Sequence, residues 1–363
     1  MKTWLVQPRD PLVIRNARPL GDGGIMRSLM FPWPSTVAGF VRTRIGTNQA
    51  TGKFELTVAA AKAIAVRGPW LASMRAGQLV EYYVPAPRDL IVHPHTNPDR
   101  LTRTRISLPH ANNGLREGEQ TDLVGTQVLV PRKDPPRDKP IAGPAFWRWQ
   151  HMLAWLSTPP DQDDIERAML GLPELTRDLR THVKIQRSTR TAEEGMLFAT
   201  EGVCFTRGTG SDAQPLSVAF LCDDPRLAQT KGVAMFGGER RISHLSPAPQ
   251  ELPTVPPASV GQGKVVRVVL ITPAIFGEGS VPKRIRGLEV VGACVDRPES
   301  HSGWDAAAGG AKATRRMAPA GSVYWLKADS EAQAREWARA HWLKCVSDKD
   351  EDCLDGFGLC VVG

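Results

Sequence analysis

The pattern of apolar and polar positions along the chain predicts many short strands with a few helices between them. Runs rich in apolar and β-branched residues have the length and composition of strands. They lie at residues 3–6, 64–71, 79–84, 216–221, 264–272, 288–296 and 322–327. Helical patterns lie at residues 35–45, 146–156, 164–170 and 331–344. Strands interspersed with a few helices favour an α+β fold over a doubly wound parallel sheet.

Residues with strong capping preferences place the ends of two helices. Ser35 and Thr36 are good N-cap residues for the first helix, and Gly46 is a plausible stop. Ser330 and Gln333 form a capping box at the start of the last long helix. In such a box each side chain accepts a hydrogen bond from the backbone N–H of the other residue.

Turn-rich and irregular segments divide the rest of the chain. The glycine-containing runs 195–198 and 202–205 are expected to be two tightly joined strands, and residues 208–214 mark a domain boundary. Residues 85–144 are polar, basic and proline-punctuated, which is typical of a functional or partly disordered insert. Five prolines make residues 247–257 an extended connector, and residues 348–352 form an acidic hinge.

Composition adds a basic balance and excludes several classes of protein. The 363 residues carry 46 Lys and Arg against 38 Asp and Glu, a net charge of +8. A basic chain suits a polyanionic partner, although many basic proteins bind no nucleic acid. The six cysteines form no C-x-x-C pair, which argues against a zinc finger or a disulfide framework and favours reduced thiols in a cytoplasmic protein. No apolar leader and no membrane-spanning run is expected.

Side chains that could perform chemistry offer no catalytic set. Trp147, Trp149 and Trp155 are expected in the core rather than in a base-stacking platform. His93 and His95 are too few ligands for a metal site. His244 is the best isolated candidate for acid–base catalysis, but no partner is visible that would tune it. We therefore expect no metal, no cofactor and no catalysis.

Six ordered motifs resemble one family, the third subunit of type III-B (Cmr) CRISPR effector complexes in the RAMP superfamily. The resemblance runs from about residue 8 to the end, and residues 85–144 and 305–318 depart from it. The motifs are DPLVIRNARP at 10–19, PWPSTVAG at 32–39, RTAEEGML at 190–197, GGERR at 237–241, GWD at 303–305 with PAGSVY at 319–324, and the glycine-rich end at 356–363.

The resemblance implies two ferredoxin-like (RRM-like βαββαβ) RAMP domains with long inserted loops. The first would span residues 1–207 with the insert at about 85–144, and the second residues 208–363. The family role is to anchor the 5′ handle of the crRNA and to assemble the complex. The implied partners are the large palm-domain subunit, the backbone RAMP subunits and, indirectly, target RNA. Cleavage and cyclic-oligonucleotide synthesis belong to other subunits.

Glycine loops, one helix start and basic clusters are the expected RNA contacts. Glycines let backbone N–H groups approach a phosphate, helix N-termini attract anions, and Arg forks match phosphate oxygens. The alternatives are a glycine bulge beside the last strand, simple N-capping, an ion pair of Arg240 with Glu239 or another carboxylate, and solvated charge runs. The candidates are Arg15, Asn16, Arg18, Ser35, Thr36, Arg42, Gly237, Gly238, Arg240, Arg241, Lys283, Arg284, Lys312, Arg315, Gly356, Phe357 and Gly358.

Two other functions compete with RNA anchoring. One is a metal-independent crRNA-processing endonuclease of the same superfamily, with His244 as its candidate base. The other is a protein-binding scaffold whose basic patches face acidic subunit surfaces.

Overall fold

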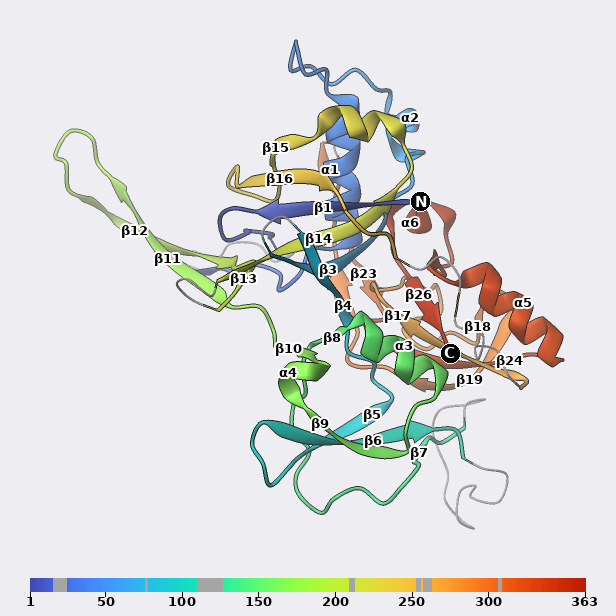
Figure 1. Ribbon diagram of the computed structural model, residues 1–363. Helices are drawn as coiled ribbons and strands as arrows, with labels where there is room; N and C mark the ends of the chain where they lie inside the picture. Colours follow the sequence, from blue (N-terminus) through green and yellow to red (C-terminus); the bar gives the residue numbers. More distant parts are fainter. Residues whose placement is uncertain are drawn as a thin grey trace.

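The computed structural model describes residues 1–15, 25–75, 78–109, 127–208, 213–252, 256, 263–305 and 309–363, and two large sheets form its centre (Figure 1). The first sheet has the strand order β10-β8-β4-β3-β14-β1-β16-β15, and β13 pairs with β14. Its strands are β1 (Lys2–Pro8), β3 (Arg67–Arg75), β4 (Gln78–Pro85), β8 (Phe146–Arg148), β10 (Gly171–Leu172), β13 (Thr206–Arg207), β14 (Gln214–Cys222), β15 (Gly232–Met235) and β16 (Ile242–Pro247).

The second sheet is built from the C-terminal third of the chain. Its order is β18-β19-β24-β17-β26-β25, and all its pairs are antiparallel. The strands are β17 (Val265–Leu270), β18 (Arg284–Ile285), β19 (Leu288–Cys294), β24 (Val323–Lys327), β25 (Lys344–Cys345) and β26 (Leu359–Val362). Antiparallel pairing of this kind fits the expected α+β class.

The two sheets share one apolar core, because strand residues alternate between the two faces. On β1, Leu5 faces the second sheet and packs in a cluster with Val266 and Val268. Trp4 and Val6 face the opposite side and pack under α1 (Pro34–Gly46). The first sheet is therefore buried on both faces near its centre.

The remaining helices are short and cover the sheets locally. Of the helix expected at 164–170, only its end is helical, because residues 162–166 pair as a strand. The helices are α2 (Val58–Lys62), α3 (Trp149–Ser157), α4 (Arg167–Leu170), η2 (Pro225–Thr230), α5 (Glu331–His341) and α6 (Asp350–Asp355). The acidic segment 348–352 is largely the first turn of α6 rather than a hinge. No helix in these described ranges is long and apolar enough to cross a membrane.

Helix starts confirm one expectation and correct another. Ser330 caps α5, and its hydroxyl accepts a hydrogen bond from the Gln333 N–H at 3.2 Å. The N-cap of α1, in contrast, is Trp33, which makes no side-chain capping bond. Pro34 takes the first helical position, because its fixed φ and missing N–H suit that position, and Ser35 is displaced into the first turn.

The described part of the insert at 85–144 contains three strands, contrary to its loop-like composition. They are β5 (Leu90–Pro94), β6 (Arg100–Ser107) and β7 (Val130–Pro131), and β9 (Gln162–Glu166) pairs with β6. Arg103 lies over the rings of Trp147 and Trp155, with its guanidinium carbon 5.1 and 5.2 Å from the ring centroids. Both rings are buried, which confirms their expected core role.

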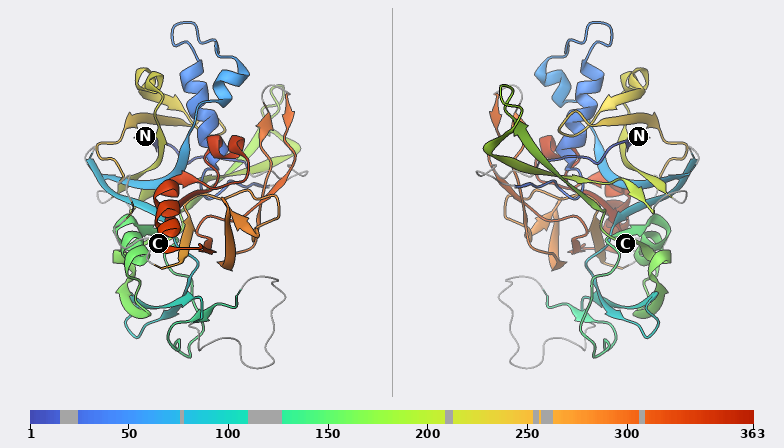
Figure 2. Two further views of the ribbon diagram at one scale, coloured as in Figure 1. Left: turned by 90° about the vertical axis from the view of Figure 1, so that its right-hand side faces the viewer. Right: turned by 90° about the vertical axis from the view of Figure 1, so that its left-hand side faces the viewer.

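A long hairpin projects from the body of the protein (Figures 1 and 2). It consists of β11 (Arg177–Ile185) and β12 (Ala192–Val203), with the short β2 (Ile25–Met26) beside its base. The two strands expected around 195–205 are thus one continuous strand. Gly202 lies against Pro11 within this strand, and an added Cβ would come within 2.9 Å of the proline Cβ, so glycine permits the close approach.

The first sheet continues across the boundary expected near residue 208. β13 pairs with β14 across that point, and β14 lies between β1 and β3. Strand pairing changes from the first to the second sheet after Pro247. The division into domains at 207/208 stays a prediction, but the sheet does not divide there.

Candidate nucleic-acid interface

One group of expected RNA-binding residues meets at the base of the hairpin. The Gly238 N–H donates to the Val13 carbonyl at 2.6 Å, so the GGERR loop packs on the strand segment that ends at Arg15. A Cβ on Gly237 would lie 3.0 Å from the same carbonyl oxygen, which explains why the loop uses glycine there. Asn16 and Arg18 lie outside the described residues.

The GGERR loop presents cations that the described part of the protein does not neutralise. Glu239 and Arg240 both adopt left-handed φ angles, 57° and 51°. Arg240 is exposed, and among described residues neither it nor Arg241 forms an ion pair, so the predicted alternative of an Arg240–Glu239 pair is not realised. The Arg241 Nε is buried without a hydrogen-bond partner. A phosphate oxygen is a fitting acceptor for the exposed Arg240 guanidinium.

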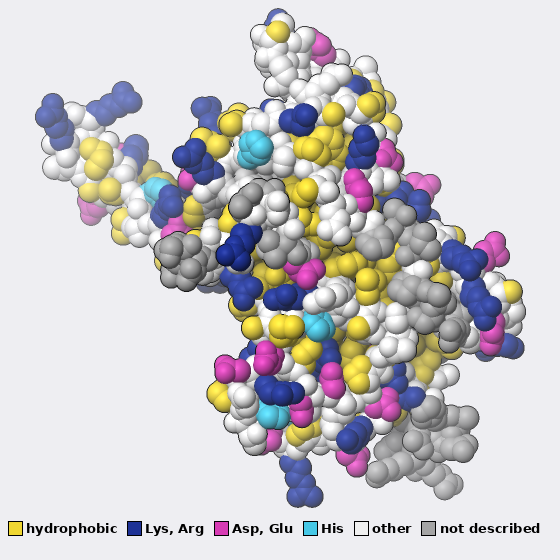
Figure 3. Space-filling model, in the orientation of Figure 1, with side chains coloured by type: hydrophobic (Ala, Val, Ile, Leu, Met, Phe, Trp, Pro, Cys, Tyr) yellow, Lys and Arg dark blue, Asp and Glu magenta, His cyan; other side chains and the backbone are white. Residues whose placement is uncertain are grey.

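The hairpin next to this loop adds both stacking and charge. His182 stacks on Phe198, with ring centroids 5.1 Å apart and an interplanar angle of 16°. Phe198 is 43% exposed, so its ring can still contact a base. Arg187 and Arg190 are exposed at the turn, and Figure 3 shows Lys and Arg side chains gathered at the outer end of the hairpin.

The other hairpin face is apolar and open to solvent. Val183 pairs directly with Leu197, and Leu179 lies four residues before Val183 on the same face of β11. Their exposed fractions are 43%, 60% and 59%. Large exposed apolar patches mark interaction sites. The sequence analysis did not predict the hairpin as a site, because the exposure of its aromatic and aliphatic side chains is visible only in the structure.

A second group of expected residues meets around His301, at the start of α1. The strands β20 (Glu299–His301) and β23 (Arg315–Met317) pair here, next to the small hairpin β21 (Trp304–Asp305) and β22 (Gly310–Ala311). His301 Nε2 lies 3.3 Å from the Ser35 hydroxyl, and its ring packs against Trp33 and Phe357. Thr36 is half-buried in the same helical turn.

Charge around His301 is positive and only partly compensated. Burial, together with the charges of Arg315 and Lys312, lowers the pKa of His301 to about 4. Arg315 pairs with the buried Asp352 at 2.6 Å, while burial raises the pKa of the Asp352 carboxyl. The Nδ1 of His301 and the Oδ2 of Asp352 are buried without partners. Neutral His301 therefore sits between cations at a helix N-terminus.

The terminal glycine loop has a packing role in this structure. Gly356 caps α6 with φ 98°, and an added Cβ would lie 2.8 Å from the Gly68 carbonyl oxygen. A Cβ on Gly358 would lie 2.7 Å from the Ser347 nitrogen. Phe357 is fully buried, so the expected stacking of its ring on a base is wrong for this conformation. Burial against distant residues decides this, which local sequence does not reveal.

Arg42 and the Lys283–Arg284 pair lie outside both groups. Arg42 pairs with Asp355 and donates to the carbonyls of Ile64 and Leu354, so its guanidinium joins α1 to α6. Lys283 and Arg284 are exposed at β18, on the α5 side of the protein and away from the hairpin (Figure 1). The structure does not bring Lys283 and Arg284 to the other candidates, whereas Arg42 contacts Leu354 and Asp355, the two residues before Gly356.

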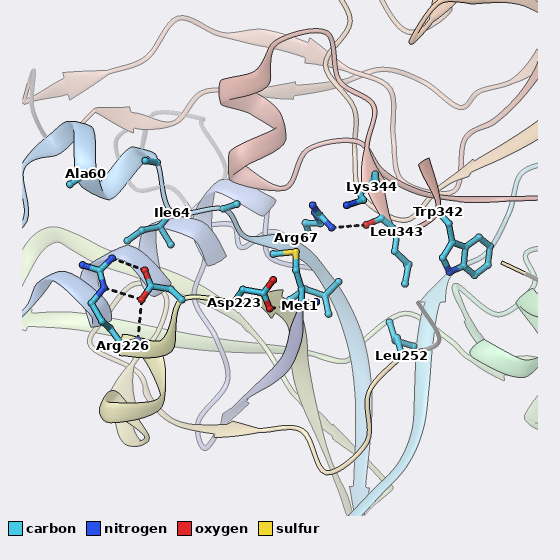
Figure 4. Close-up of a pocket in the computed structure, with 14 residues that line it drawn as sticks. Met1, Ala60, Ile64, Arg67, Asp223, Arg226, Leu252, Trp342, Leu343 and Lys344 are labelled. Carbon is cyan, nitrogen blue, oxygen red and sulfur yellow. Dashed lines mark hydrogen bonds and ion pairs between the residues drawn. The ribbon is translucent and has the colours of Figure 1, made fainter. Parts of the chain in front are cut away.

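A pocket of about 720 Å³ contains none of the expected site residues (Figure 4). Several of its charged groups are engaged with one another or with the backbone. The amine of Met1 lies 3.4 Å from Asp223, and Arg67 donates to the Leu343 carbonyl at 3.3 Å. In the described part of the chain, no three His, Cys, Asp or Glu residues are grouped to hold a metal ion.

Comparison with known proteins identifies a family. A model of CRISPR-associated proteins, Cas_Cmr3, matches residues 4–363. No curated protein matches the chain. Similar solved structures include the type III-B Cmr-β complex bound to cognate target RNA and AMPPnP (16% identity, 91% of this chain and 86% of that chain, TM-score 0.49). The same complex bound to cognate target RNA aligns with 16% identity, 89% and 86% coverage and a TM-score of 0.49.

A type III-A Csm3–Csm4 subcomplex is more distant, with 11% identity over 91% of this chain and 93% of that chain and a TM-score of 0.37. The family match extends over nearly the whole sequence and agrees with the order of motifs found in it. The chain therefore belongs to the Cas_Cmr3 family of CRISPR-associated proteins, and its predicted membership of the type III-B (Cmr) system is confirmed.

Proposed function

We propose that this chain is the subunit that anchors the 5′ handle of the crRNA in a type III-B effector complex, without cleaving it. The observation that carries the proposal is the surface at the hairpin base. There, the loop that carries Arg240 and Arg241 packs on the segment ending at Arg15 through Gly238, and neither arginine pairs with a carboxylate of the described residues. The neighbouring hairpin exposes Phe198. Phosphate-binding cations next to a stacking ring are what single-stranded RNA requires.

The junction around His301 supports a second contact with the same RNA. Residues 28–33 connect the two groups, because Ser28 is hydrogen-bonded to the Ile14 N–H at 2.9 Å and Trp33 contacts His301. Lys312 and Arg315 add positive charge at the start of α1. An RNA backbone that runs from the GGERR loop to the start of α1 would meet cations at both ends.

We also propose that both sheets derive from βαββαβ units, as expected of RAMP domains. The order β16-β1-β14-β3 is the fourth, first, third and second strand of one such unit, with α1 and η2 as its connections. The order β26-β17-β24-β19 repeats this arrangement, with α5 as its second helix. The described residues between β17 and β18 contain no helix, so the second unit would lack its first.

The apolar face of the hairpin supports assembly with protein partners. Leu179, Val183 and Leu197 expose aliphatic groups that RNA does not bury well. We propose that docking of the large palm-domain subunit and the backbone subunits in the cytoplasm uses surfaces of this kind. Crosslinking of the assembled complex tests this directly: crosslinks to protein and none to the handle would favour a pure scaffold.

The test of RNA anchoring is the salt dependence of handle binding by the assembled complex. Replacing Arg240 and Arg241 by Ala should weaken binding and lower the salt slope by about 0.7 per lost phosphate contact. Replacing Lys283 and Arg284 by Ala is the matched control, because these cations lie on the far side. Equal affinity and slope in both double variants would remove the GGERR loop from the site.

The endonuclease alternative is tested with the same protein. His244 is exposed on β16 next to Val233 of β15, with no acid–base partner among the described residues. Incubation with repeat RNA in the absence of metal should give no discrete product. A unique product that His244→Ala abolishes would establish cleavage and overturn the non-catalytic proposal.

A further inference from the structure

Two cysteines that no RNA-binding role uses lie together at the corner of the second sheet. Cys345 ends β25, and Cys353 lies in α6 eight positions later in the chain. The two thiols influence each other's pKa, and both residues are partly exposed and unoxidised. The Cys353 thiol donates to the Ser347 carbonyl at 3.3 Å. The turn between them is fixed by buried Ser347, whose hydroxyl donates to the Phe357 carbonyl at 2.9 Å.

Cys353 has the surroundings of a reactive thiol. The Arg286 guanidinium lies 3.0 Å from its sulfur and also donates to the Ser347 carbonyl at 2.5 Å, which fixes its position. The neighbouring Cys345 thiol and the Arg286 guanidinium lower the pKa of Cys353, against burial, whereas the pKa of Cys345 is raised. A thiolate next to Arg is the nucleophilic form of cysteine.

The third cysteine of this corner is differently placed. Cys360 is fully buried in β26, and its thiol donates to the His341 carbonyl at 3.4 Å. Burial raises its pKa far above the ordinary value. Cys353 therefore has one accessible thiol partner among the described cysteines, which is Cys345.

We propose that Cys353, held against Arg286, is a peroxide-reactive thiol and that Cys345 converts its oxidised form to a disulfide. The Cys353 sulfur attacks one peroxide oxygen, an S–O bond forms, the O–O bond breaks, and the leaving hydroxide is protonated to water. The Cys345 sulfur then attacks Cys353, an S–S bond forms, and a second hydroxide leaves as water. The two thiols lose two electrons and two protons to one hydrogen peroxide.

The disulfide would tie α6 to β25 beside the junction described above. α6 carries Asp352 and Asp355, the carboxylates that hold Arg315 and Arg42. Oxidation would therefore restrain the element that holds these two arginines in place. The proposal does not depend on RNA anchoring and can fail or succeed without it.

Peptide mapping of the intact chain tests the linkage. After treatment with hydrogen peroxide, free thiols are capped with N-ethylmaleimide and the protein is digested. We expect a Cys345–Cys353 peptide pair, lighter by two hydrogen atoms than the two thiol peptides. Cys204, a partly exposed residue whose thiol pKa is raised by burial, should stay reduced and be recovered with its N-ethylmaleimide cap. Equal oxidation of Cys204 and Cys353, or a different linkage, overturns the proposal.

Two variants separate the roles of the residues. In Cys345→Ser, the sulfenic acid of Cys353 should persist and be trapped by dimedone, and its absence would contradict the proposed order of steps. Arg286→Met should slow oxidation of Cys353 on the order of 3- to 10-fold, because thiolate is lost while intrinsic nucleophilicity rises. An unchanged rate, in a variant whose Tm shows that it folds, would remove Arg286 from the site.

Discussion

His301 shows how one side chain at the junction depends on residues far away in sequence. It is 4% exposed, contacts Ser35 at the start of α1 and packs on Phe357 near the end of the chain. Lys312 and Arg315 disfavour a further positive charge there. The imidazole is therefore neutral in the folded protein at pH 7, although a free histidine would be partly protonated just below that pH.

Stability should fall with acid because of this histidine. Its pKa is about 4 in the folded protein and 6.5 for an unperturbed side chain, so between these values the unfolded chain binds the proton more tightly. The contribution of neutral His301 to the free energy of unfolding is complete above about pH 6.5. It is lost progressively towards pH 4, and the total loss is at most about 3 kcal/mol. Urea unfolding of wild type and His301→Gln checks this.

The substituted protein should show a flatter stability profile between pH 4 and 6.5, whereas His244→Gln, at an exposed position, should follow the wild type. Parallel profiles for all three proteins would mean that His301 is not the group responsible.

Residue-scale expectations succeeded where local chemistry decides and failed where tertiary contacts decide. Ser330 caps its helix because the interaction involves only the next turn. Phe357 was expected to stack on RNA, but Ile275, Met317 and Trp33 enclose it from other parts of the fold. Arg42 was similarly expected at RNA, and a carboxylate at the other end of the chain pairs with it.

At the scale of elements, the helix α5 is the clearest case in which sequence specifies a boundary. Ser330 accepts from the Gln333 N–H, while the Gln333 side chain reaches back to the Asp329 N–H at 2.6 Å. The predicted capping box is thus formed, but the Gln333 side chain accepts from the N–H of Asp329 rather than from that of Ser330. α5 ends at His341, before the expected Lys344, because residues 344–345 pair with β26.

Removing this cap should destabilise the protein modestly. Ser330→Ala leaves the Gln333 N–H without its acceptor and should cost about 1 kcal/mol of unfolding free energy. Ser330→Asp keeps an acceptor oxygen at the same place and should stay close to wild type. Urea denaturation of the three proteins measures both differences, and equal losses in the two variants would show that the cap is not the cause.

Strands of the insert and the hairpin were harder to predict than the helices. β6 is a run of basic and polar residues, yet it forms a strand. Arg103 and Thr102 donate hydrogen bonds to the carboxylates of Asp163 and Asp164 on β9. β12 contains glycine and glutamate, and only its pairing with β11 makes it a continuous strand. Partners remote in sequence supply the hydrogen bonds that define these elements.

At the scale of the whole molecule, a buried ionic network joins the insert, α3 and the second sheet. Arg267 of β17 lies 3.0 Å from Asp89, which is fully buried and accepts a second bond from Trp155 Nε1 at 2.8 Å. Arg267 also donates to the Trp155 carbonyl. Three parts of the chain that are distant in sequence are thus fixed by one carboxylate.

Asp89→Asn should be strongly destabilising, because it leaves the Arg267 charge buried without a counter-charge. We expect a loss of about 3–5 kcal/mol in unfolding free energy. Asp161→Asn is the control. The Asp161 carboxylate that pairs with Arg105 is exposed, so this ion pair should contribute about 0–1 kcal/mol to the free energy of unfolding. Chemical denaturation distinguishes the two, and similar small losses in both would indicate that water or another anion compensates Arg267.

The place of β1 between β14 and β16 bears on how the protein is made. Both neighbours of β1 lie beyond residue 213, so a chain leaving the ribosome carries this apolar strand with two open edges for most of its synthesis. The second sheet draws all its strands from residues 265–362 and can close soon after they emerge. We expect the first sheet to depend on chaperones that shield unpaired strands, and the second to form without them.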